Sequence, residues 1–259
     1  MRVAICYSGQ LRTGPACISN HLKYFSGVDA DFFGHIWSVN TDKRNSLETP
    51  ATKIPSSVIK SYSKNLNFKL FQVEDQFDRV TRNDAGHIAL YYSWLKSIHL
   101  KRQYERETGV TYDAVVKIRP DMLLNPYRRL SRELEGVTEH GQFLVELLQG
   151  AGPNKIWYDD TLWIAANHVM DRVVDWYEAN LVPIHYGYFQ HGLKILGIDV
   201  GHTTTAGFPY CILRKGCVGI DTDKKYQKCW RYDDDYKRSA KPFPEPVDYY
   251  DPSIVYNLS

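Results

Sequence analysis

The sequence predicts an α/β protein in which helices flank a mainly parallel sheet. Short apolar runs alternate with helical patterns along most of the 259 residues, and parallel strands need long, usually helical connections between them. The chain shows no internal repeat and no low-complexity linker. We therefore expect residues 1–210 to form one domain. The basic, aromatic and turn-rich residues 211–259 are expected to form an irregular C-terminal extension packed on that domain.

The first elements follow from apolar runs and their boundaries. Residues 3–7 are apolar and precede a Ser-Gly pair, which is typical of a buried strand followed by a tight turn. A helix is predicted over 15–25, because a proline suits its first turn. Apolar and aromatic residues predict strands over 31–37 and 68–73. Residues 38–56 are rich in Ser, Thr, Asn, Asp and Pro and predict a loop.

The clearest helix prediction covers residues 85–107, with Asn83 or Asp84 as a cap at its start and Gly109 at its end. Its apolar residues recur at spacings of three and four, which gives a stripe on one face. Later strands are predicted at 112–118, 142–147 and 161–166, and later helices at 169–178 and 188–196, bounded by Asn167 and Gly197.

Composition excludes several classes of protein. The formal net charge is only +2, so a general electrostatic affinity for nucleic acid is not indicated. The five cysteines form no Cys-x-x-Cys pair, which favours a reducing compartment over a disulfide framework. The N-terminal apolar run is too short for a signal peptide, and no stretch reaches the roughly 20 apolar residues of a membrane span. We expect a cytoplasmic protein, in the host cytoplasm if the source is a phage or virus.

Polar residues that follow predicted strands are the first candidates for a site, because open α/β sheets bind ligands beyond the carboxyl ends of their strands. The first set is Ser8-Gly9-Gln10-Leu11-Arg12. Gly9 lets the backbone approach a ligand, backbone amides there can bind an anion, and Arg12 offers a fork suited to phosphate. The alternative is a plain turn with a surface arginine, which would give the same sequence pattern.

The second set is Arg119-Pro120-Asp121, where the proline ends the preceding strand. Arg119 can neutralise a diphosphate, and Asp121 can hold a divalent metal or bind sugar hydroxyls. The third is Asp160, which precedes a predicted strand and could act as a general base. The alternatives are a local Arg–Asp pair that fixes a turn, and a solvated acid. His202 is the one histidine considered as a metal ligand, although no metal-binding spacing supports it.

Taken in order along residues 1–200, these segments resemble a family of GT-A-like glycosyltransferases found in phages, large algal viruses and bacterial surface-polysaccharide clusters. The matching segments are Ser8 to Arg12, the Asp31-Phe32-x-x-His35-x-Trp37 element, the helix that carries Asn83, Tyr91, Tyr92, Ser93 and Lys96, the strand from Tyr112 to Asp121, and the strand from Asp160 to Ala165.

The resemblance implies a Rossmann-like domain that binds a nucleotide-sugar donor. It implies that Ser8, Gly9, Gln10 and Arg12 lie near the nucleotide, with Asn83 and Lys96 also toward the donor. Arg119 and Asp121 stand where many GT-A enzymes carry Asp-x-Asp. Because Arg119 replaces the first acid of that motif, a Mn²⁺ or Mg²⁺ site at Asp121 is in question, and Arg119 can take over part of the metal's charge.

The function expected from this resemblance is transfer of a hexosyl or pentosyl group to a hydroxyl of a glycan or other small acceptor. Basic and aromatic residues interleave in the tail, a composition that also suits stacking with nucleic acid. A phage enzyme that glycosylates a hydroxymethylated DNA base, for example with arabinose or glucose, is therefore the alternative. A non-catalytic nucleotide- or glycan-binding protein would use the same fold. A nucleotide-dependent oxidoreductase is disfavoured, because the first turn lacks G-x-G-x-x-G.

Overall fold

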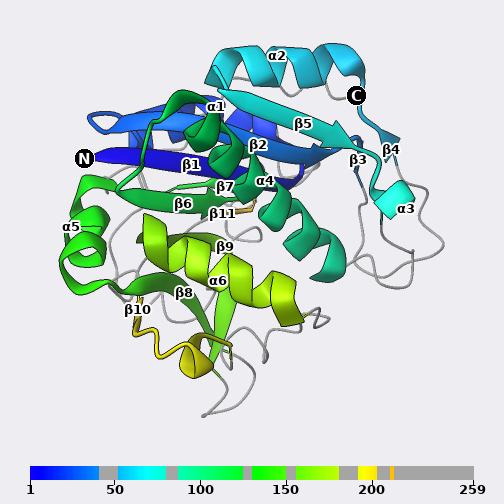
Figure 1. Ribbon diagram of the computed structural model, residues 1–259. Coiled ribbons are helices and arrows are strands. Elements are labelled where there is room, and N and C mark those ends of the chain that lie inside the picture. Colours follow the sequence, from blue (N-terminus) through cyan, green and yellow to red (C-terminus); the bar gives the residue numbers. More distant parts are fainter. Residues whose placement is uncertain are drawn as a thin grey trace.

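A computed structural model describes residues 1–40, 52–79, 87–124, 130–149, 156–180, 192–202 and 211–212. Its centre is a seven-stranded sheet in the order β10-β8-β9-β6-β1-β2-β5 (Figure 1). The strands are β1 (Arg2–Gln10), β2 (Asp29–Trp37), β5 (Leu70–Glu74), β6 (Ala114–Ile118), β8 (Phe143–Gln149), β9 (Ile156–Ala166) and β10 (Val200–His202).

The sheet is mainly parallel, as the sequence predicts. Strand β1 pairs in parallel with β2 and β6, β2 with β5, and β10 with β8. Strand β9 runs antiparallel to both of its neighbours, β6 and β8. The carboxyl ends of β5, β2, β1 and β6 therefore lie along one edge of the sheet, which we call the carboxyl edge; the opposite edge is the amino edge.

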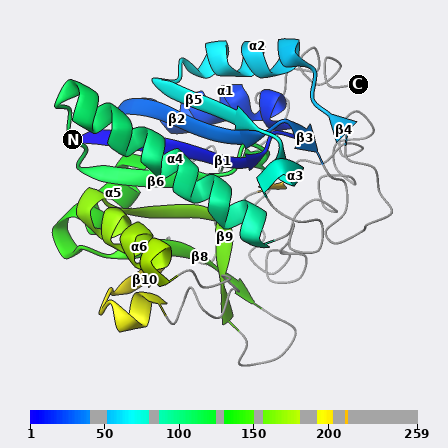
Figure 2. The same cartoon turned by 45° about the vertical axis from the view of Figure 1, so that its right-hand side comes forward.

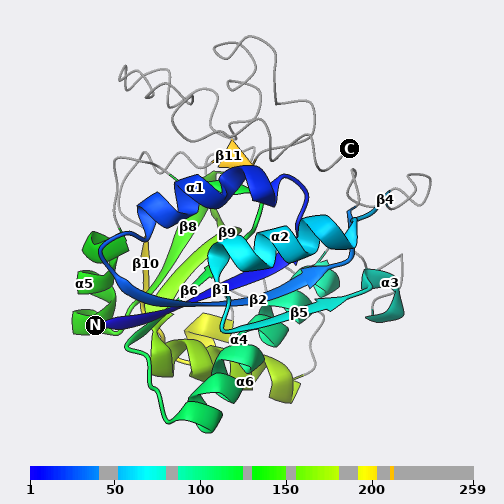
Figure 3. The same ribbon diagram turned by 90° about the horizontal axis from the view of Figure 1, so that it is seen from above.

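Helices cover both faces of the sheet. Helices α1 (Gly14–Tyr24) and α2 (Ser56–Leu66) lie on one face, and α4 (His87–Thr108) and α6 (Asn167–Asn180) lie on the other (Figures 2 and 3). Helix α5 (Leu130–His140) packs beside β9 and β6, and α3 (Gln76–Arg79) follows β5. The expected α/β architecture with flanking helices is thus confirmed. No helix within the described segments has the length and apolar character needed to cross a membrane.

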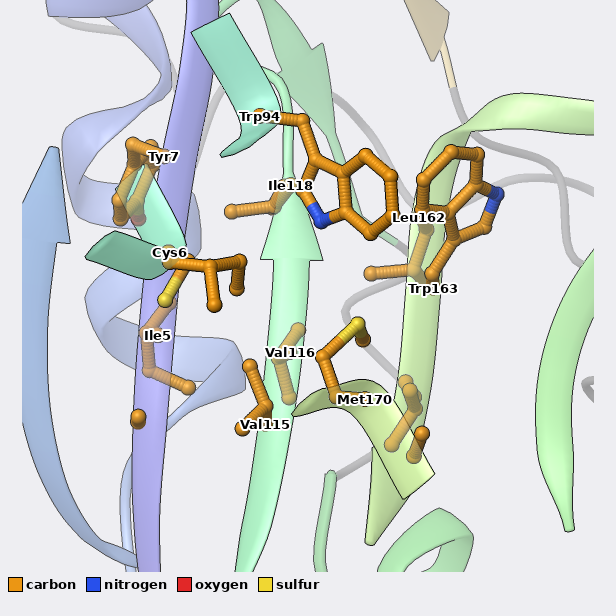
Figure 4. Packing of buried hydrophobic residues seen from close by; sticks show 14 of the residues in the cluster. Ile5, Cys6, Tyr7, Trp94, Val115, Val116, Ile118, Leu162, Trp163 and Met170 are labelled. Atoms are coloured by element: carbon orange, nitrogen blue, oxygen red, sulfur yellow. The ribbon is translucent and has the colours of Figure 1, made fainter. Parts of the chain in front are cut away.

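The core lies between the sheet and the two helix layers. Figure 4 shows buried residues of β1, β6 and β9 packed against Trp94 of α4 and Met170 of α6. The rings of Trp94 and Trp163 meet edge to face, with 4.9 Å between their centroids. Tyr7 instead points toward the other layer, where its ring contacts His21 and Tyr62. This alternation fixes which residues of β1 face which helices.

The structure differs from the predicted elements at several places. Residues 156–166 form one strand, so Asp160 lies inside β9 rather than ahead of a strand. Helices α2 and α5 were not predicted, because most of their residues are polar and the apolar face is narrow. In α2 only Val58, Tyr62 and Leu66 are buried. The predicted loop at 38–56 contains two short paired strands, β3 (Val39–Asn40) and β4 (Thr52–Lys53).

Several predicted boundaries are confirmed. Gly109 and Gly197 follow helical residues with φ of +72° and +62°, as expected for residues that end a helix. The strand before Pro120 ends at Ile118. Of the expected C-terminal extension only Cys211–Ile212 is described; it forms β11, which pairs antiparallel with β7 (Met122–Leu123). The remainder of that prediction lies outside the described residues.

Candidate functional site

Two arginines converge on one buried carboxylate at the carboxyl edge. Arg119 donates from Nε to Asp121 Oδ1 and from Nη2 to Oδ2, both at 3.0 Å. Arg12 donates from Nη1 to the same Oδ2 at 3.2 Å. Asp121 is fully buried, whereas the side chains of Arg119 and Arg12 keep 8% and 18% of their surface exposed. The structure thus brings together three residues that the sequence analysis placed in two separate sets.

The sheet explains this meeting. Strands β1 and β6 are adjacent, and Tyr7 stands opposite Ile118, so the residues that follow each strand emerge side by side. Arg12 has a left-handed backbone with φ of +44°, which costs a non-glycine residue about 1 kcal/mol. Its N–H donates to Asn40 Oδ1 at 2.9 Å, and this bond helps to hold the turn.

Helix α1 holds the segment that carries Asp121. Asn20 makes two bonds to Leu124, donating to its carbonyl at 2.9 Å and accepting from its N–H at 2.7 Å. His21 Nε2 contacts the carbonyl oxygen of Met122, and its Nδ1 lies 3.0 Å from the hydroxyl of Tyr7. Burial lowers the pKa of His21 to about 4, so the ring is neutral at pH 7. It donates from Nε2 to the carbonyl and accepts at Nδ1 from Tyr7.

The first turn of α1 packs closely on the same segment. A Cβ atom added to Gly14 would lie 2.9 Å from Cβ of Pro120 and 2.8 Å from Cδ1 of Leu11. Only glycine therefore lets the helix approach the residue that separates Arg119 from Asp121.

The backbone amide of Gly9 is engaged within the protein. It donates to Ser93 Oγ of α4 at 2.7 Å, and Ser93 donates in turn to the carbonyl of His35 at 2.9 Å. The left-handed φ of +112° at Gly9 orients the peptide for this contact. The amides of Gly9 and Arg12 are both used inside the protein. The expectation that amides of this turn bind an anion therefore does not extend to these two, and it stays a prediction for the others.

A second polar cluster lies at the ends of β2 and β5. Glu74 accepts a hydrogen bond from Tyr92 at 3.0 Å and lies 3.6 Å from His35 Nε2. Burial opposes ionisation, yet the bond from Tyr92 and the nearby cations hold the pKa of Glu74 below its ordinary value. Burial lowers the pKa of His35 to about 4 against the opposing effect of Glu74. Lys96 Nζ lies 5.4 Å from the centre of the Tyr92 ring, so this predicted donor residue belongs to the second cluster.

Gln10 contacts α3, the helix that follows β5. Its Nε2 donates to Oε1 of Gln76, the first residue of α3, at 2.9 Å. Nearby, Trp37 stacks on Tyr92 with 5.6 Å between the ring centres. These contacts join β1 to α3 and β2 to α4 beside the carboxyl edge.

Two buried hydroxyls lie on the α4 face of the sheet, toward its carboxyl edge. Ser8 and Thr161 are fully buried, and neither side-chain oxygen has a hydrogen-bond partner among the described residues. Ser8 follows Tyr7 on β1, and Thr161 stands one position beyond the last β6–β9 pair, Ile118 with Leu162. A buried hydroxyl without a partner costs about 1–3 kcal/mol, so these two oxygens are candidates for contact with a ligand.

The other predicted residues are only partly described. Because β9 runs antiparallel to β6, residues before Leu162 extend past the carboxyl end of β6; the backbone of Asp160 therefore reaches the carboxyl edge, although its side chain is not described. His202 lies on β10, three strands from β6, or roughly 14 Å at the usual strand spacing. Asn83 lies outside the described residues. Within the described segments no three metal-binding side chains are grouped.

Sequence reasoning missed Asn20, His21 and Asn40, which hold the site in place, and the hydroxyl of Thr161, which has no partner among the described residues. Their polar side chains carry no motif, and nothing along the chain connects Asn20 with Leu124 more than a hundred residues later. Asn20 and His21 did offer one signal, since they are polar residues inside a predicted helix.

Comparison with known proteins gives a likeness of fold only. No family model and no curated protein matches the chain. Among solved structures, the nucleoside-diphosphate-sugar pyrophosphorylase of Vibrio cholerae RC9 is 12% identical, with 91% of this chain and 98% of that one covered and a TM-score of 0.44. The galactosyltransferase LgtC, in complex with donor and acceptor sugar analogues, is 11% identical over 95% and 85%, with a TM-score of 0.42. Scores this low carry no weight in assigning a function.

Proposed function

We propose that the chain is a glycosyltransferase that uses a nucleotide-diphosphate sugar as donor. The observation that carries the proposal is the convergence of Arg12 and Arg119 on buried Asp121 at the carboxyl edge of an α/β sheet. This is the edge at which such sheets bind ligands. Guanidinium groups match phosphate oxygens with paired N–H donors and stay charged at every physiological pH. The ordered motif resemblance to GT-A-like transferases supports the same assignment.

The proposed reaction assigns a part to each residue. The bond between the anomeric carbon of the sugar and the diphosphate oxygen breaks, and the leaving diphosphate keeps the electron pair. Arg12 and Arg119 stabilise the charge that develops there. The acceptor hydroxyl oxygen forms the new bond to the anomeric carbon and loses its proton to a base. We assign that base to Asp160, because β9 carries its backbone to the carboxyl edge.

The proposed acceptor is a glycan or another small hydroxyl compound. The basic residues that would favour a hydroxymethylated DNA base lie in the tail, outside the described residues. A duplex-binding assay at several salt concentrations separates these acceptors, because contacts with phosphates weaken steeply as salt rises. Salt-dependent binding to duplex DNA would contradict the small acceptor.

A thermal-shift screen against UDP-, GDP-, CMP- and dTDP-sugars tests the donor, because a ligand that binds the folded state raises Tm. We then expect release of the nucleoside diphosphate on incubation with acceptors. Arg119→Ala should lower the rate by about 100-fold or more, the usual effect of removing one group that stabilises developing charge. Arg2→Ala, which breaks an Arg–Asp pair at the amino edge, is the matched control and should keep the rate.

Two results would contradict the proposal. If no nucleotide sugar shifts the Tm, the site is not a donor site. If a nucleotide sugar binds but no acceptor or water consumes it, the chain is a non-catalytic binding protein.

A further inference from the structure

By its motif resemblance Asp121 stands where many GT-A enzymes carry an acid of Asp-x-Asp, yet the surroundings of its carboxylate do not suit a cation. Three N–H donors from two guanidinium groups already bind its two oxygens at 3.0–3.2 Å. A carboxylate has about four lone-pair sites, and this side chain is fully buried. A metal ion bound to this carboxylate would lie beside two permanent positive charges, which repel it.

We infer that Asp121 is a positioning residue that holds Arg12 and Arg119 together, and that these arginines meet the charge of the diphosphate without a metal ion at Asp121. This inference rests on the proposed function and specifies how its donor site works. Both arginines bind the same oxygen, Oδ2, so two like charges are brought close together. Without the carboxylate between them they would repel each other.

The rest of the site fixes this arrangement from both sides. Asn40 holds the backbone of Arg12. Asn20 and His21 hold Leu124 and Met122, just beyond Asp121. Because the segments that carry Arg12 and Asp121 are both anchored, the guanidinium groups are oriented before the ligand binds. Preorganisation of this kind increases the electrostatic stabilisation that fixed donors give to a transition state.

The first test needs no variant. Calorimetric titration of the full chain with UDP, GDP, CDP, dTDP and inorganic pyrophosphate is carried out in EDTA, and again with Mn²⁺ or Mg²⁺ in excess. We expect at least one nucleoside diphosphate to bind in EDTA, with a Kd changed less than about threefold by metal, a difference of under about 1 kcal/mol. Binding that appears only with Mn²⁺ or Mg²⁺ would overturn the inference and leave the proposed function standing.

Variants then test the role of Asp121. Asp121→Asn keeps the shape of the side chain and removes its charge, and we expect it to weaken diphosphate binding in EDTA by at least about tenfold. It should also lower kcat for the donor found in the screen by about 100-fold or more. Asp31→Asn is the matched control, since Asp31 is a nearly buried carboxylate bonded to Arg2 at the amino edge of the same sheet. Its binding and kcat per folded molecule should match those of the natural chain.

The outcomes separate the inference from the proposed function. If Asp121→Asn binds diphosphate as well as the natural chain does, the positioning role is wrong. If Asp121→Asn does not fold, the comparison of EDTA with metal in the natural chain still decides the inference. If no nucleoside diphosphate binds under any condition, both the inference and the proposed function fail.

Discussion

The two edges of the sheet carry similar Arg–Asp contacts in different surroundings. At the amino edge, Asp31 accepts from Arg2 at 2.7 and 3.0 Å and lies 3.4 Å from Lys69, and both cations keep 36% of their side chains exposed. At the carboxyl edge the cations are mostly buried, at 8% for Arg119 and 18% for Arg12. Removing an arginine from water costs free energy. We therefore expect the Arg–Asp contacts of the carboxyl edge to stabilise the fold less than those of the amino edge.

The buried hydroxyl groups show a similar contrast, although left-handed residues occur at both edges, Arg12 at the carboxyl edge and Asn67 ahead of β5. At the carboxyl edge, Ser8 and Thr161 are buried with no partner among the described residues. At the amino edge, the hydroxyl of Tyr112 donates to Asp31 at 2.8 Å and the amide of Arg2 to Asp113 at 2.6 Å. Strain and unsatisfied groups that persist in a fold concentrate at functional sites. This comparison favours the proposal that the amino edge supports stability and the carboxyl edge binds the ligand.

The largest expected effect on stability comes from Lys101 of α4, which joins α4 to α6 on the side of the amino edge. Lys101 is fully buried, and its Nζ contacts Asp171, Glu105 and Asn167. Lys101→Met keeps the aliphatic stem but leaves Glu105 and Asn167 without their cation, whereas Asp171 keeps its bond to Arg102; the loss should cost about 3 kcal/mol. Urea denaturation measures the loss. Donor turnover per folded molecule should stay unchanged, and a fall in kcat would contradict the division between the two edges.

Acid should act on the carboxyl edge through His21. The pKa of His21 is lowered by burial to about 4, against about 6.5 in an unfolded chain. Between these values only the unfolded state takes up the proton, so stability falls as pH drops from 6.5 to 4, by about 3 kcal/mol. Tyr7 and Asp121 are the ionisable groups that face the ring.

The measurement is urea denaturation at a series of pH values for the natural chain and for His21→Gln. The variant should lose stability less steeply between pH 6.5 and 4, with the contribution of His35 common to both proteins. Equal slopes would show that His21 is not held neutral.

Gly14→Ala tests the packing of α1 on the arginine segment. The added Cβ would lie 2.9 Å from Cβ of Pro120, and overpacking of this kind costs about 1–3 kcal/mol. Because Pro120 separates Arg119 from Asp121, the variant should also raise the Kd for diphosphate. The control is Gly136→Ala, since a Cβ on Gly136 of α5 meets nothing within 4 Å. Unchanged diphosphate binding in Gly14→Ala would show that the segment can shift without disturbing the arginines.

The smallest expected effect has the opposite sign. Ser8→Ala removes a buried hydroxyl that has no partner among the described residues, so stability should stay the same or rise by about 1 kcal/mol. If the hydroxyl contacts the donor, the Kd for the nucleotide sugar rises in the same variant. Calorimetry and urea denaturation on one protein sample measure both quantities. A loss of stability would show that Ser8 supports the fold instead.

Much of the fold could be predicted along the chain, because strands and long helices carry local signals. Local signals of this kind are the apolar run of β1, the apolar stripe of α4, and the glycines that follow α4 and the helical turn at 192–195. The same locality explains the errors. Helix α2 buries only three of its residues, which is too few for its pattern to stand out. The early start of β9 depends on pairing with β8, which supplies partners for Ile156, Trp157 and Tyr158.

The sequence by itself determined the order of strands and helices and placed Arg12, Arg119 and Asp121 just after strands, since each depends on residues within a few positions. Only the tertiary structure decided that the two arginines share a single carboxylate oxygen, that Ser93 takes the amide of Gly9, and that Asn20 and His21 hold the segment beyond Asp121. Apart from the local bond between Arg119 and Asp121, these contacts join residues 84 to 109 positions apart. Distances of that kind are set by strand order and register, which hydrogen bonds and packing across the whole sheet determine together.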